Sequence, residues 1–492
     1  MPYTAQVLNA ASAEVQTGLH LAMPALDYAV LLETGQAHGA FREELDRYDW
    51  LAAGGAHKVH RLTIATAEDW SQFSAAWRSR PTWLFGVLGY DLKNALESTA
   101  RSRHVSDPGE PDLEFFEPNW VVTCAAGELH LHVHPAHPVQ ASDWWTQIQA
   151  LGQAASISSS EEVVGTPNVA DVECILSPTW DAMTYQKKAA SLQKLIVEGD
   201  LYEANLCALW EASGAAHPVS VYEALQARAD APMAGLFKSP STWLISGSPE
   251  RYVTVRTSPH GRFAYSQPIK GTAPVHTSGE DLLKNEKERA ENTMIVDLVR
   301  NDLSRIAQKG SVCVPRYLQL RSLPTVHHLV STVEAQLRPT ADWLSVVQAS
   351  FPMGSMTGAP KIRAMERIDT HESARRGWYS GALGYATPDG ECDFNVVIRS
   401  LIYHPTDARW KSWAGSALTV YAQPQAEWEE LQLKMQATAA ALQDASVLRL
   451  DSIHRNEYAA SAVAAKESPD TDQRTNEPTN RVKNAPCHEK NR

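Results

Sequence analysis

The sequence predicts an α/β protein of the α+β type, in which strands and helices are interleaved irregularly. Short runs with the period of strands are mixed with helical stretches, and they do not alternate regularly as in a parallel sheet. The chain has 492 residues, of which 43% are hydrophobic and 21% are charged. This composition provides a sizeable core, in one large body or in two or three domains.

Composition also excludes several classes of protein. The formal net charge of -13 argues against non-specific nucleic-acid binding, which requires a basic surface. The six cysteines include no C-x-x-C pair, which argues against a zinc ribbon and a dense disulfide framework. The first residues lack a secretory signal pattern, and no apolar run approaches the ~20 residues that span a bilayer. We therefore expect a soluble, cytoplasmic protein with no membrane or nucleic-acid partner.

Periodicity and turn residues predict the main elements. Gly199 closes one predicted helix, and the turn Thr387-Pro388-Asp389-Gly390 centres a predicted hairpin, whose return strand carries Arg399 on its polar face. The predicted elements are strands at 83–90 and 201–206, helices at 183–198, 282–308 and 427–442, and the hairpin at 379–402.

The chain divides into three predicted regions. An N-terminal lobe covers residues 1–155, and a Ser- and Gly-containing stretch at 154–169 is typical of a linker or long surface loop. A larger region covers residues 171–450. Residues 455–492 are rich in polar residues and cannot bury enough apolar surface to offset their ordering entropy, so we expect them to be disordered.

Lys270, in the stretch Pro268-Ile269-Lys270-Gly271-Thr272, is a candidate nucleophile. A lysine beside glycine at a partly apolar strand end can be desolvated, which lowers its pKa and frees the amine. The alternative is an ordinary solvated lysine, and the local sequence by itself favours that alternative.

Carboxylates on two predicted helices are candidate metal ligands. Glu291 and Asp302 lie in line with a buried stripe, and Glu427 and Glu430 lie one turn apart. Magnesium usually takes one or two carboxylates, so one glutamate from each helix is sufficient. The alternatives are salt bridges at the edge of the stripe and the preference of acids for the first turn of a helix.

Two basic residues are candidates for binding an anion. Lys361 follows a run of small residues, but the run lacks the P-loop spacing, so nucleotide binding is discounted. Lys361 is either an anion-binding or a structural residue. Arg399 is a candidate carboxylate clamp, with a cross-strand ion pair as the alternative.

Taken together, these segments resemble the chorismate-utilising enzymes, which include anthranilate synthase component I, aminodeoxychorismate synthase component I, and the isochorismate and salicylate synthases. The resemblance runs from about Met183 to Leu442, in the order of the family. The matching segments are residues 198–206, 248–251, 268–272, 289–302, 327–331, 358–361, 397–399 and 427–430. It implies a large two-layered body, with β-sheets sandwiched and covered by helices.

The resemblance also implies a role for each matching position. Lys270 would attack C2 of chorismate, Glu250 would protonate the departing C4 hydroxyl, and His328 would lie near that hydroxyl. Glu291 and Glu430 would hold Mg²⁺. The residues that would bind the substrate are Gly271, Thr272, Tyr379, Arg399, Gly415, Ser416 and Ala417, with Lys361 added as a candidate from its own segment.

Lys270 distinguishes the branches of the family, because anthranilate-type enzymes usually carry alanine there and aminodeoxychorismate synthases carry lysine. The resemblance therefore implies conversion of chorismate and ammonia to 4-amino-4-deoxychorismate, for 4-aminobenzoate and folate synthesis. Ammonia would come from a glutamine amidotransferase subunit.

Three alternatives remain at this point. One is anthranilate synthesis, and a weaker one is isochorismate or salicylate synthesis. A third is chorismate binding without catalysis, because residues 415–422 depart from the family's Gly-rich run. Separately, Leu31-Leu32-Glu33-Thr34 resembles the anthranilate synthase segment that helps bind regulatory tryptophan, which implies a tryptophan pocket in the N-terminal lobe.

Overall fold

The computed structural model describes residues 3–35, 45–97, 99, 102–161, 173–324 and 326–464, with side chains up to residue 154 in the helix that ends at 161 and up to residue 446 in the last helix. Residues Met1–Arg449 form one compact unit, and Leu450–Arg492 form a second. Within the described part, no helix has the length and apolar character needed to cross a bilayer.

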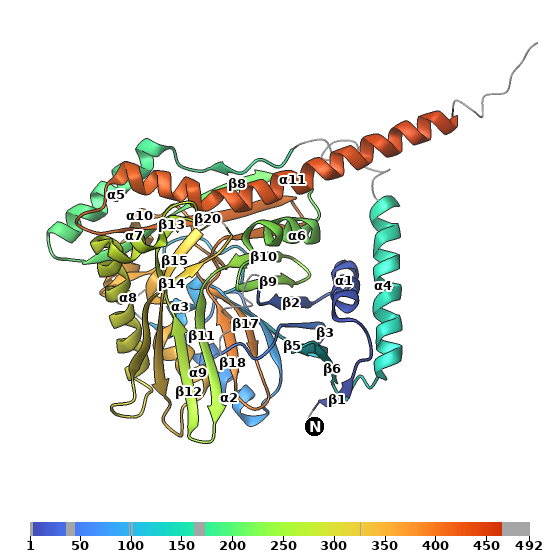
Figure 1. Cartoon of the computed structure of the whole chain (residues 1–492), viewed down its shortest axis with the longest axis horizontal. Coiled ribbons are helices and arrows are strands. Elements are labelled where there is room, and N and C mark those ends of the chain that lie inside the picture. The colour runs from blue at the N-terminus through green and yellow to red at the C-terminus, as the bar shows by residue number, and fades with distance from the viewer. Residues whose placement is uncertain are drawn as a thin grey trace, which may run out of the picture. The chain divides into compact units, whose positions relative to one another are not determined.

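Among the described residues all strand pairings are antiparallel, and they link 20 strands into one continuous network, which divides at one long strand into two sheets that share it (Figure 1). The first sheet runs in the order β1 (Thr4–Val7), β6 (Glu128–Val133), β5 (Leu113–Ala125), β3 (Trp50–Leu62), β2 (Ala29–Glu33), β9 (Met233–Lys238), β10 (Trp243–Ser248), β19 (Ser400–His404), β20 (Arg409–Leu418) and β8 (Glu203–Ser213). The far edge of β8 pairs with β7 (Ser177–Pro178) and β16 (Gly358–Ala359).

The second sheet begins at the same strand β5. It continues through β4 (Leu84–Leu88), β17 (Ala382–Ala386), β18 (Cys392–Asn395), β11 (Arg251–Ser258), β12 (Gly261–Gln267) and β15 (Val326–Gln336). Strand β15 also pairs with β13 (Ile269–Pro274) and β14 (Cys313–Ser322). Strands from both predicted regions therefore pair with one another, as β2 does with β9 and β4 with β17.

Strand β5 changes partners at a proline. Its first part pairs with β4 through Leu113–Phe116, and its last part pairs with β6 from Trp120 onward. Pro118 lies between these two parts, opposite Ala56, where the β3 register shifts. Because proline has no N–H to donate, it suits a position where a strand leaves one neighbour and has not yet joined the next.

Helices cover these sheets. They are α1 (Ser12–Ala22), α2 (Ala67–Ser79), α3 (Lys93–Leu96), α4 (Ala141–Glu161), α5 (Ala182–Val197), α6 (Pro218–Ala229), α7 (Gly279–Lys284), α8 (Glu286–Ser304), α9 (Trp343–Ser350), α10 (Lys361–His371) and α11 (Pro424–Ala464), with short 3₁₀ turns at Met23–Ala25, Tyr90–Leu92 and Gly354–Met356. In Figure 1, α8 lies beside β13 and β15, and α1 and α4 lie side by side. The predicted α+β fold class is confirmed.

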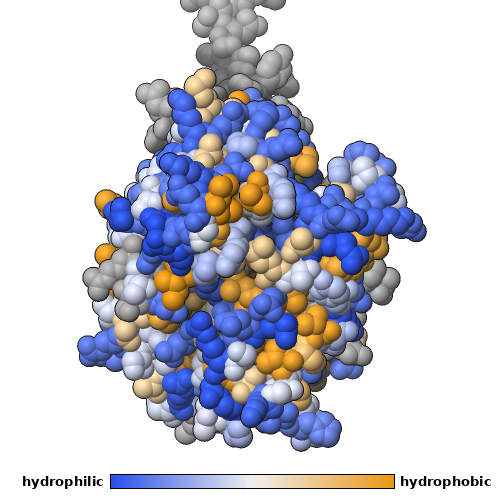
Figure 2. Space-filling model, turned by 90° about the vertical axis from the view of Figure 1, so that its left-hand side faces the viewer, coloured by the Kyte–Doolittle hydropathy of each residue, from blue (hydrophilic) through white to orange (hydrophobic). Residues whose placement is uncertain are grey.

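The face that carries α8 shows hydrophilic residues with separate hydrophobic patches between them (Figure 2). This mixture is expected for a helix that buries a single stripe. The buried stripe of α8 consists of Ile295, Val296, Val299 and Leu303, and it packs against residues of β11 and α9. The charged positions of the helix are left on the outside, except at the two buried acids Glu291 and Asp302.

Two predicted elements differ from the structure. The helix predicted for 282–308 is divided at Asn285, whose side chain accepts hydrogen bonds from the N–H groups of Lys287 at 3.0 Å and Glu288 at 3.3 Å. Asparagine is among the best N-cap residues, so a new helix begins there. The hairpin of β17 and β18 is confirmed, but its return strand ends at Asn395. Arg399 has a φ of +53°, which ends the predicted alternation.

The ends of two predicted regions are partly helical. Helix α4 continues through Glu161, into the stretch predicted as a linker, and residues 162–172 lie outside the described residues. Helix α11 continues through Ala464, into the stretch predicted to be disordered, and residues 465–492 lie outside the described residues. Disorder beyond Ala464 stays a prediction.

Three stacked aromatic rings attach the start of α11 to the first sheet. Trp428 lies 5.9 Å from Trp210 of β8 and 5.4 Å from Tyr185 of α5, measured between ring centroids. Leu431 and Met435 continue the same buried face. Aromatic pairs at this separation contribute about 0.5–1.5 kcal/mol beyond the area they bury. These rings therefore fix the rotation of α11 about its axis, with Trp428, Leu431 and Met435 on the side that packs on the first sheet.

Arg376 is fully buried and joins three segments. Its guanidinium donates to both carboxylate oxygens of Glu372, to the carbonyl of Asn205 at 2.8 Å and to the carbonyl of Met356 at 2.7 Å. Replacing Arg376 by methionine keeps the volume but leaves Glu372 as an uncompensated buried charge. We expect the free energy of unfolding to fall by about 3–5 kcal/mol, measured by urea denaturation at neutral pH.

Arg300→Met serves as the matched control, because Arg300 pairs with Asp297 across an exposed helix surface. Exposed pairs contribute about 0–1 kcal/mol, so this variant should unfold near the wild-type midpoint. Equal losses in the two variants would contradict the role assigned to Arg376.

Candidate functional site

Lys270 projects from a bulge in strand β13. The pairing of β13 with β15 shifts register between Ile269 and Thr272, so Lys270 and Gly271 lie outside the regular ladder. Gly271 has a φ of +88°, a conformation that favours glycine. Bulges of this kind redirect a side chain, and here the Lys270 ammonium lies 3.0 Å from Oε1 of Glu203.

The predicted desolvation of Lys270 is present, but the predicted lowering of its pKa is wrong. The side chain is only 12% exposed, and burial alone would lower the pKa. The carboxylates of Glu203, Glu291 and Glu430 outweigh that effect and raise the pKa of Lys270 above its usual range. The local sequence shows the apolar neighbours but not the acids that the fold brings from other segments.

Glu203 was missed as a site residue by the sequence reasoning. It begins β8 and is fully buried, and its backbone is held where β16 pairs with β8. The neighbouring N–H groups of Tyr202 and Asn205 donate to the carbonyls of Ala359 and Thr357, each at 2.8 Å. A buried acid near the start of an otherwise apolar strand is the signal that could have identified it.

Helix α8 brings Glu291 toward Lys270. The next residue, Asn292, donates to the carbonyl of Leu329 in β15 at 3.1 Å and to that of Lys270 at 3.5 Å. Ser331 donates to the Asn292 side chain at 2.7 Å. These bonds fix the helix against β13 and β15, so Glu291 lies on the side of the helix that faces the lysine.

Glu291 is 8% exposed, and its Oε1 has no hydrogen-bond partner among the described residues. Burial raises the pKa of this carboxyl to about 7. A buried carboxylate with an unpaired oxygen requires a cation or a proton.

Helix α11 brings Glu430 to the same neighbourhood. Its carboxylate lies 2.5 Å from the Lys434 ammonium, and this lysine holds the pKa of Glu430 below its usual value, although burial alone would raise it. One turn earlier, Glu427 accepts a hydrogen bond from Ser416 and lies 3.2 Å from the ammonium of Lys287. Glu427 is therefore paired with Lys287 and Glu430 with Lys434, and Glu430 also interacts electrostatically with Lys270.

Glu291 and Glu430 form a donor set that suits magnesium. Both are hard oxygen ligands from separate helices, and magnesium is commonly held by one or two carboxylates together with water and substrate oxygens. Oε1 of Glu291 has no hydrogen bond among the described residues, and its nearest cation, the Lys287 ammonium, is 3.8 Å away, so this oxygen can still accept a metal ligand bond. Glu291 and Glu430 thus fit the Mg²⁺ ion that the family resemblance implies, and the binding of Mg²⁺ stays a proposal.

Glu250 lies in the turn between β10 and β11 and is 4% exposed. Burial raises its pKa to about 7, and the charge of Lys270 is one of the influences that oppose the rise. Such a carboxyl is partly protonated at neutral pH and can donate a proton to a leaving group. Glu250 and Lys270 therefore lie close enough to interact electrostatically, and their roles as acid and nucleophile stay predictions.

His328 lies in β15 opposite Thr272 of β13, and the Thr272 hydroxyl is 3.2 Å from its Nδ1. Burial lowers the pKa of His328 to about 3, so the imidazole is neutral at physiological pH. It can orient a hydroxyl by hydrogen bonding but does not carry a positive charge.

Arg399, Lys434 and the end of β20 are connected. The Arg399 guanidinium donates to the carbonyl of Lys434 at 3.3 Å, and the Lys434 ammonium donates to the carbonyl of Gly415 at 2.8 Å. Gly415 lies opposite Cys207, and a Cβ there would lie 2.6 Å from the Cys207 sulfur, so the close approach requires glycine. These residues gather positive charge beside Glu430.

The remaining predicted substrate-binding residues differ in their surroundings. Tyr379 is buried and stacks on Trp413 of β20, with ring centroids 5.8 Å apart. Ser416 and Ala417 pair with Leu206 and Asn205 of β8 in the regular ladder. The Ser416 hydroxyl is already used by Glu427, so it contributes to positioning that acid.

Lys361 does not join this cluster. Its ammonium lies 2.5 Å from Asp302 and 2.8 Å from the carbonyl of Ser350, and it begins α10. Burial lowers its pKa, with Asp302 opposing the change. These contacts favour the structural alternative for Lys361, because it ties α10 to α8 through Asp302, and its role in binding the substrate stays a prediction.

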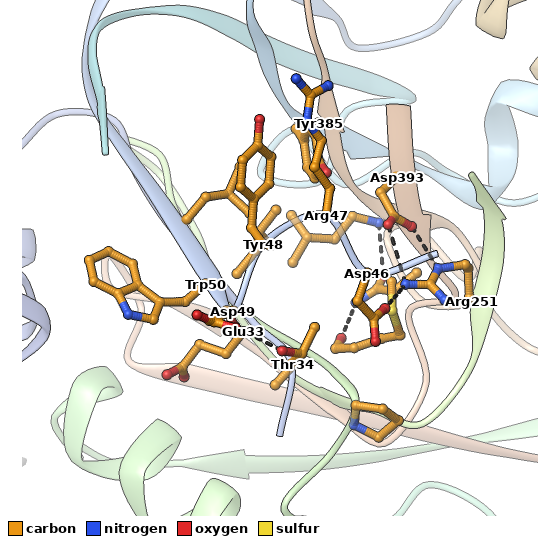
Figure 3. Close-up of a pocket in the computed structure, with 17 residues that line it drawn as sticks. Glu33, Thr34, Asp46, Arg47, Tyr48, Asp49, Trp50, Arg251, Tyr385 and Asp393 are labelled. Carbon is orange, nitrogen blue, oxygen red and sulfur yellow. Dashed lines mark hydrogen bonds and ion pairs between the residues drawn. The ribbon is translucent and has the colours of Figure 1, made fainter. Parts of the chain in front are cut away.

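A separate pocket lies where residues 32–51 of the N-terminal lobe meet residues 232–395 of the larger region (Figure 3). It contains Thr34 of the segment Leu31-Leu32-Glu33-Thr34, and the Thr34 hydroxyl donates a hydrogen bond to the carbonyl of Asp49 at 2.8 Å. Arg251 bridges Asp46 at 2.5 Å and Asp393 at 2.9 Å on one side of it. Apolar residues from both sheets complete the lining, namely Leu32, Leu51, Pro232, Met233, Ala234 and Leu383.

Curated proteins with similar sequences belong to two related groups. An aminodeoxychorismate synthase of Streptomyces griseus is 36% identical over 71% of this chain and 48% of its own length. An aminodeoxychorismate synthase component 1 of Bacillus subtilis is 33% identical over 53% of this chain and 55% of its own. An anthranilate synthase component 1 of Haloarcula marismortui is 32% identical over 74% of each.

The first two relatives with this similarity, both from Streptomyces, are matched over only 37% and 48% of their own length.

Solved structures share the fold at low sequence identity. Anthranilate synthase component I from Streptococcus pneumoniae superimposes with a TM-score of 0.60 at 22% identity, covering 89% of this chain and 92% of that one. MenF, the menaquinone-specific isochorismate synthase of Escherichia coli, gives 0.64 at 18% identity, covering 90% and 95%.

The sequence pattern described as chorismate binding enzyme matches residues 33–440, which include every residue of the cluster around Lys270. The match and the shared fold confirm the resemblance inferred from the ordered motifs. The chain belongs to the family of chorismate binding enzymes.

Proposed function

We propose that this protein converts chorismate and ammonia to 4-amino-4-deoxychorismate, the reaction of aminodeoxychorismate synthase component I. The observation that supports it is the buried Lys270, which projects from a bulge into a group of acids that includes Glu250 and Glu291. A positioned lysine amine can open a covalent route that ammonia alone does not have.

In this proposal Lys270 attacks C2 of chorismate as the C4 hydroxyl departs. Glu250 donates the proton that lets the hydroxyl leave as water, which suits a carboxyl with a pKa of about 7. The neutral His328 orients the same hydroxyl. Ammonia then forms a bond to C4, and the bond between C2 and Lys270 breaks.

The substrate carboxylates require positive charge, which the overall acidic chain must concentrate locally. Arg399 and Lys434 supply it beside Gly415, and the backbone at Gly271 and Thr272 lies next to the lysine. Mg²⁺ held by Glu291 and Glu430 would neutralise the ring carboxylate.

The proposal includes a partner and a place in metabolism. The Bacillus subtilis relative is named as component 1 of its synthase. We propose that ammonia reaches this chain from a glutamine amidotransferase subunit, in the cytoplasm, and that the product serves 4-aminobenzoate and folate synthesis. Aromatisation of the product requires another enzyme.

Anthranilate formation is the second candidate function, because anthranilate synthase relatives match at 32–35% identity. In that reaction the amine is placed at C2 and pyruvate is lost. Lys270 favours the first candidate, since in the proposed mechanism its amine, rather than ammonia, forms the bond to C2.

The product distinguishes the two candidates. With chorismate, Mg²⁺ and ammonium, we expect 4-amino-4-deoxychorismate, detected by chromatography and mass spectrometry. Lys270→Ala should abolish or divert its formation, because the nucleophile is gone, while circular dichroism remains that of a folded protein. Lys284→Ala is the control, since Lys284 is exposed on α7. Anthranilate fluorescence from the wild type would refute the proposal.

Magnesium should stabilise the wild-type protein against heat, because a ligand that binds only the folded state raises its unfolding temperature. Glu291→Gln should lose this stabilisation, whereas Asp297→Asn, an exposed position on the same helix, should keep it. The pKa of Glu291 near 7 adds a pH dependence, because metal binding requires the ionised carboxylate.

Magnesium affinity should therefore be full above pH 7 and should fall as the pH decreases through 7 toward 6, by up to about tenfold per pH unit. Isothermal titration at pH 6 and pH 8 measures it. An affinity independent of pH, or stabilisation retained in Glu291→Gln, would remove Glu291 from the metal site.

We also propose that the pocket around Thr34 binds tryptophan as a regulator. It offers carboxylates at Asp46 and Asp49, and an apolar lining for a ring. Titration of the protein with tryptophan should release heat in calorimetry. Thr34→Arg should abolish this binding, because the arginine side chain would fill the pocket. Absence of both binding and inhibition in the wild type would exclude the proposal.

A further inference from the structure

The partner of Lys270 is a fully buried carboxylate with one unused oxygen. Oε1 of Glu203 lies 3.0 Å from the lysine Nζ, while Oε2 is buried without a hydrogen-bond partner among the described residues. Leaving a buried carboxylate oxygen unpaired costs free energy, and an oxygen in this state can accept a proton.

A second buried lysine in the same protein shows the contrast. Lys361 lies 2.5 Å from Asp302 and also donates to the carbonyl of Ser350 at 2.8 Å. Its ammonium is thus shared between two acceptors on different segments, as expected for a structural tie. Within the described residues, the Lys270 ammonium donates a hydrogen bond to the Glu203 carboxylate alone.

The proposed function requires Lys270 as a neutral amine at the moment of attack, but its surroundings favour the ammonium. The groups that face it are Glu203 from β8, Glu288 and Glu291 from α8, Glu430 from α11 and Glu250 from the turn after β10. Two of these acids would be engaged by the metal, and Glu250 must keep its own proton for the hydroxyl. Glu203 is the acid in direct contact with Nζ.

We propose that Glu203 is the positioning residue of Lys270, which holds Nζ in place for attack and takes its proton as the amine becomes the nucleophile. The inference rests on the proposed function. The transfer breaks one Nζ–H bond and forms one O–H bond on Glu203. The pair changes from two opposite charges to two neutral groups, so its net charge is unchanged and no proton has to leave the buried site.

The proton count closes over the cycle. The neutral amine forms the bond to C2, and the C4 hydroxyl leaves as water with the proton of Glu250. Ammonia forms the bond to C4, and Lys270 leaves C2 as a neutral amine. Glu250 regains its proton from the new C4 ammonium group, and Glu203 returns its proton to Lys270. The net reaction consumes ammonia and releases water.

Competitive labelling with acetic anhydride tests the pair without substrate or metal. The reagent acylates free amines, so the pH dependence of labelling reports the pKa of Lys270, read by peptide mass spectrometry. In Glu203→Gln the lysine loses an anionic partner, so we expect it to be labelled several-fold faster at neutral pH. Lys361 is the internal control, because its pair with Asp302 is untouched and its side chain is as buried, at 11% exposed.

Turnover should change in the opposite direction. Although its amine is more available, Glu203→Gln should form product at least tenfold more slowly, with KM for chorismate nearly unchanged, because the amine is neither held nor able to pass its proton within the pair. Glu203→Asp keeps a carboxylate, so it should recover part of the rate and the wild-type labelling profile. Glu203→Asp also tests the inference if the Glu203→Gln variant does not fold.

Faster labelling combined with slower turnover is the signature of positioning. Unchanged labelling of Lys270 in Glu203→Gln, or wild-type turnover in that variant, would overturn the inference. Failure of the proposed function is distinguishable, because then the wild type itself makes no 4-amino-4-deoxychorismate, whatever the labelling shows.

Discussion

The long pairing of β3 with β5 is the constraint on which the rest of the fold depends. Strand β5 belongs to both sheets, and Pro118 marks the point where it exchanges β4 for β6. Because the two sheets share this strand, their relative orientation depends on its twist. The lysine strand β13 lies toward one end of the resulting path and β8 lies toward the other, so their meeting depends on how the two sheets fold over one another.

The site concentrates acids in a way that only a cation-rich environment can support. Glu203, Glu250, Glu291 and Glu430 all influence the same lysine or are influenced by it. Like charges at this density raise carboxyl pKa values unless cations compensate them. The protein compensates in part with Lys270, Lys287 and Lys434, each in contact with one of the acids. Glu250 and Glu291 keep raised pKa values, which makes one suited to donate a proton and the other to receive a metal.

The sequence predicts more of the chemistry than of the geometry that supports it. The sequence predicts the α+β class, the hairpin at β17 and β18 and the ordered family motifs, because periodicity and turn residues act locally. The division of one long helix at Asn285 was missed, since the apolar period continued across the cap. The left-handed conformation of Arg399 was also missed, because a strand pattern gives no sign of a single reversed φ.

Long-range partners explain the other differences. Lys361 has the local surroundings of an anion-binding residue, but Asp302 reaches it from a helix 59 positions earlier. Lys270 has apolar neighbours in sequence, yet Glu203 reaches it from 67 positions away and, together with Glu291 and Glu430, reverses the direction of its pKa change. In both cases a charge from a distant element decides the outcome. Periodicity does not show which charged residues from distant elements come into contact. An ordered set of family motifs can indicate that their segments lie close together.

The aromatic stack that attaches α11 has a consequence for how the chain acquires its chemistry. Trp428 docks on Trp210 and Tyr185 late in the sequence, after the strands that carry Glu203 and Lys270 have been made. Glu430 lies on the same helix, two residues after Trp428, so the packing of these rings also sets where the Glu430 side chain starts. A substitution that loosens the rings should therefore displace an acid that acts on Lys270 without touching either charged residue.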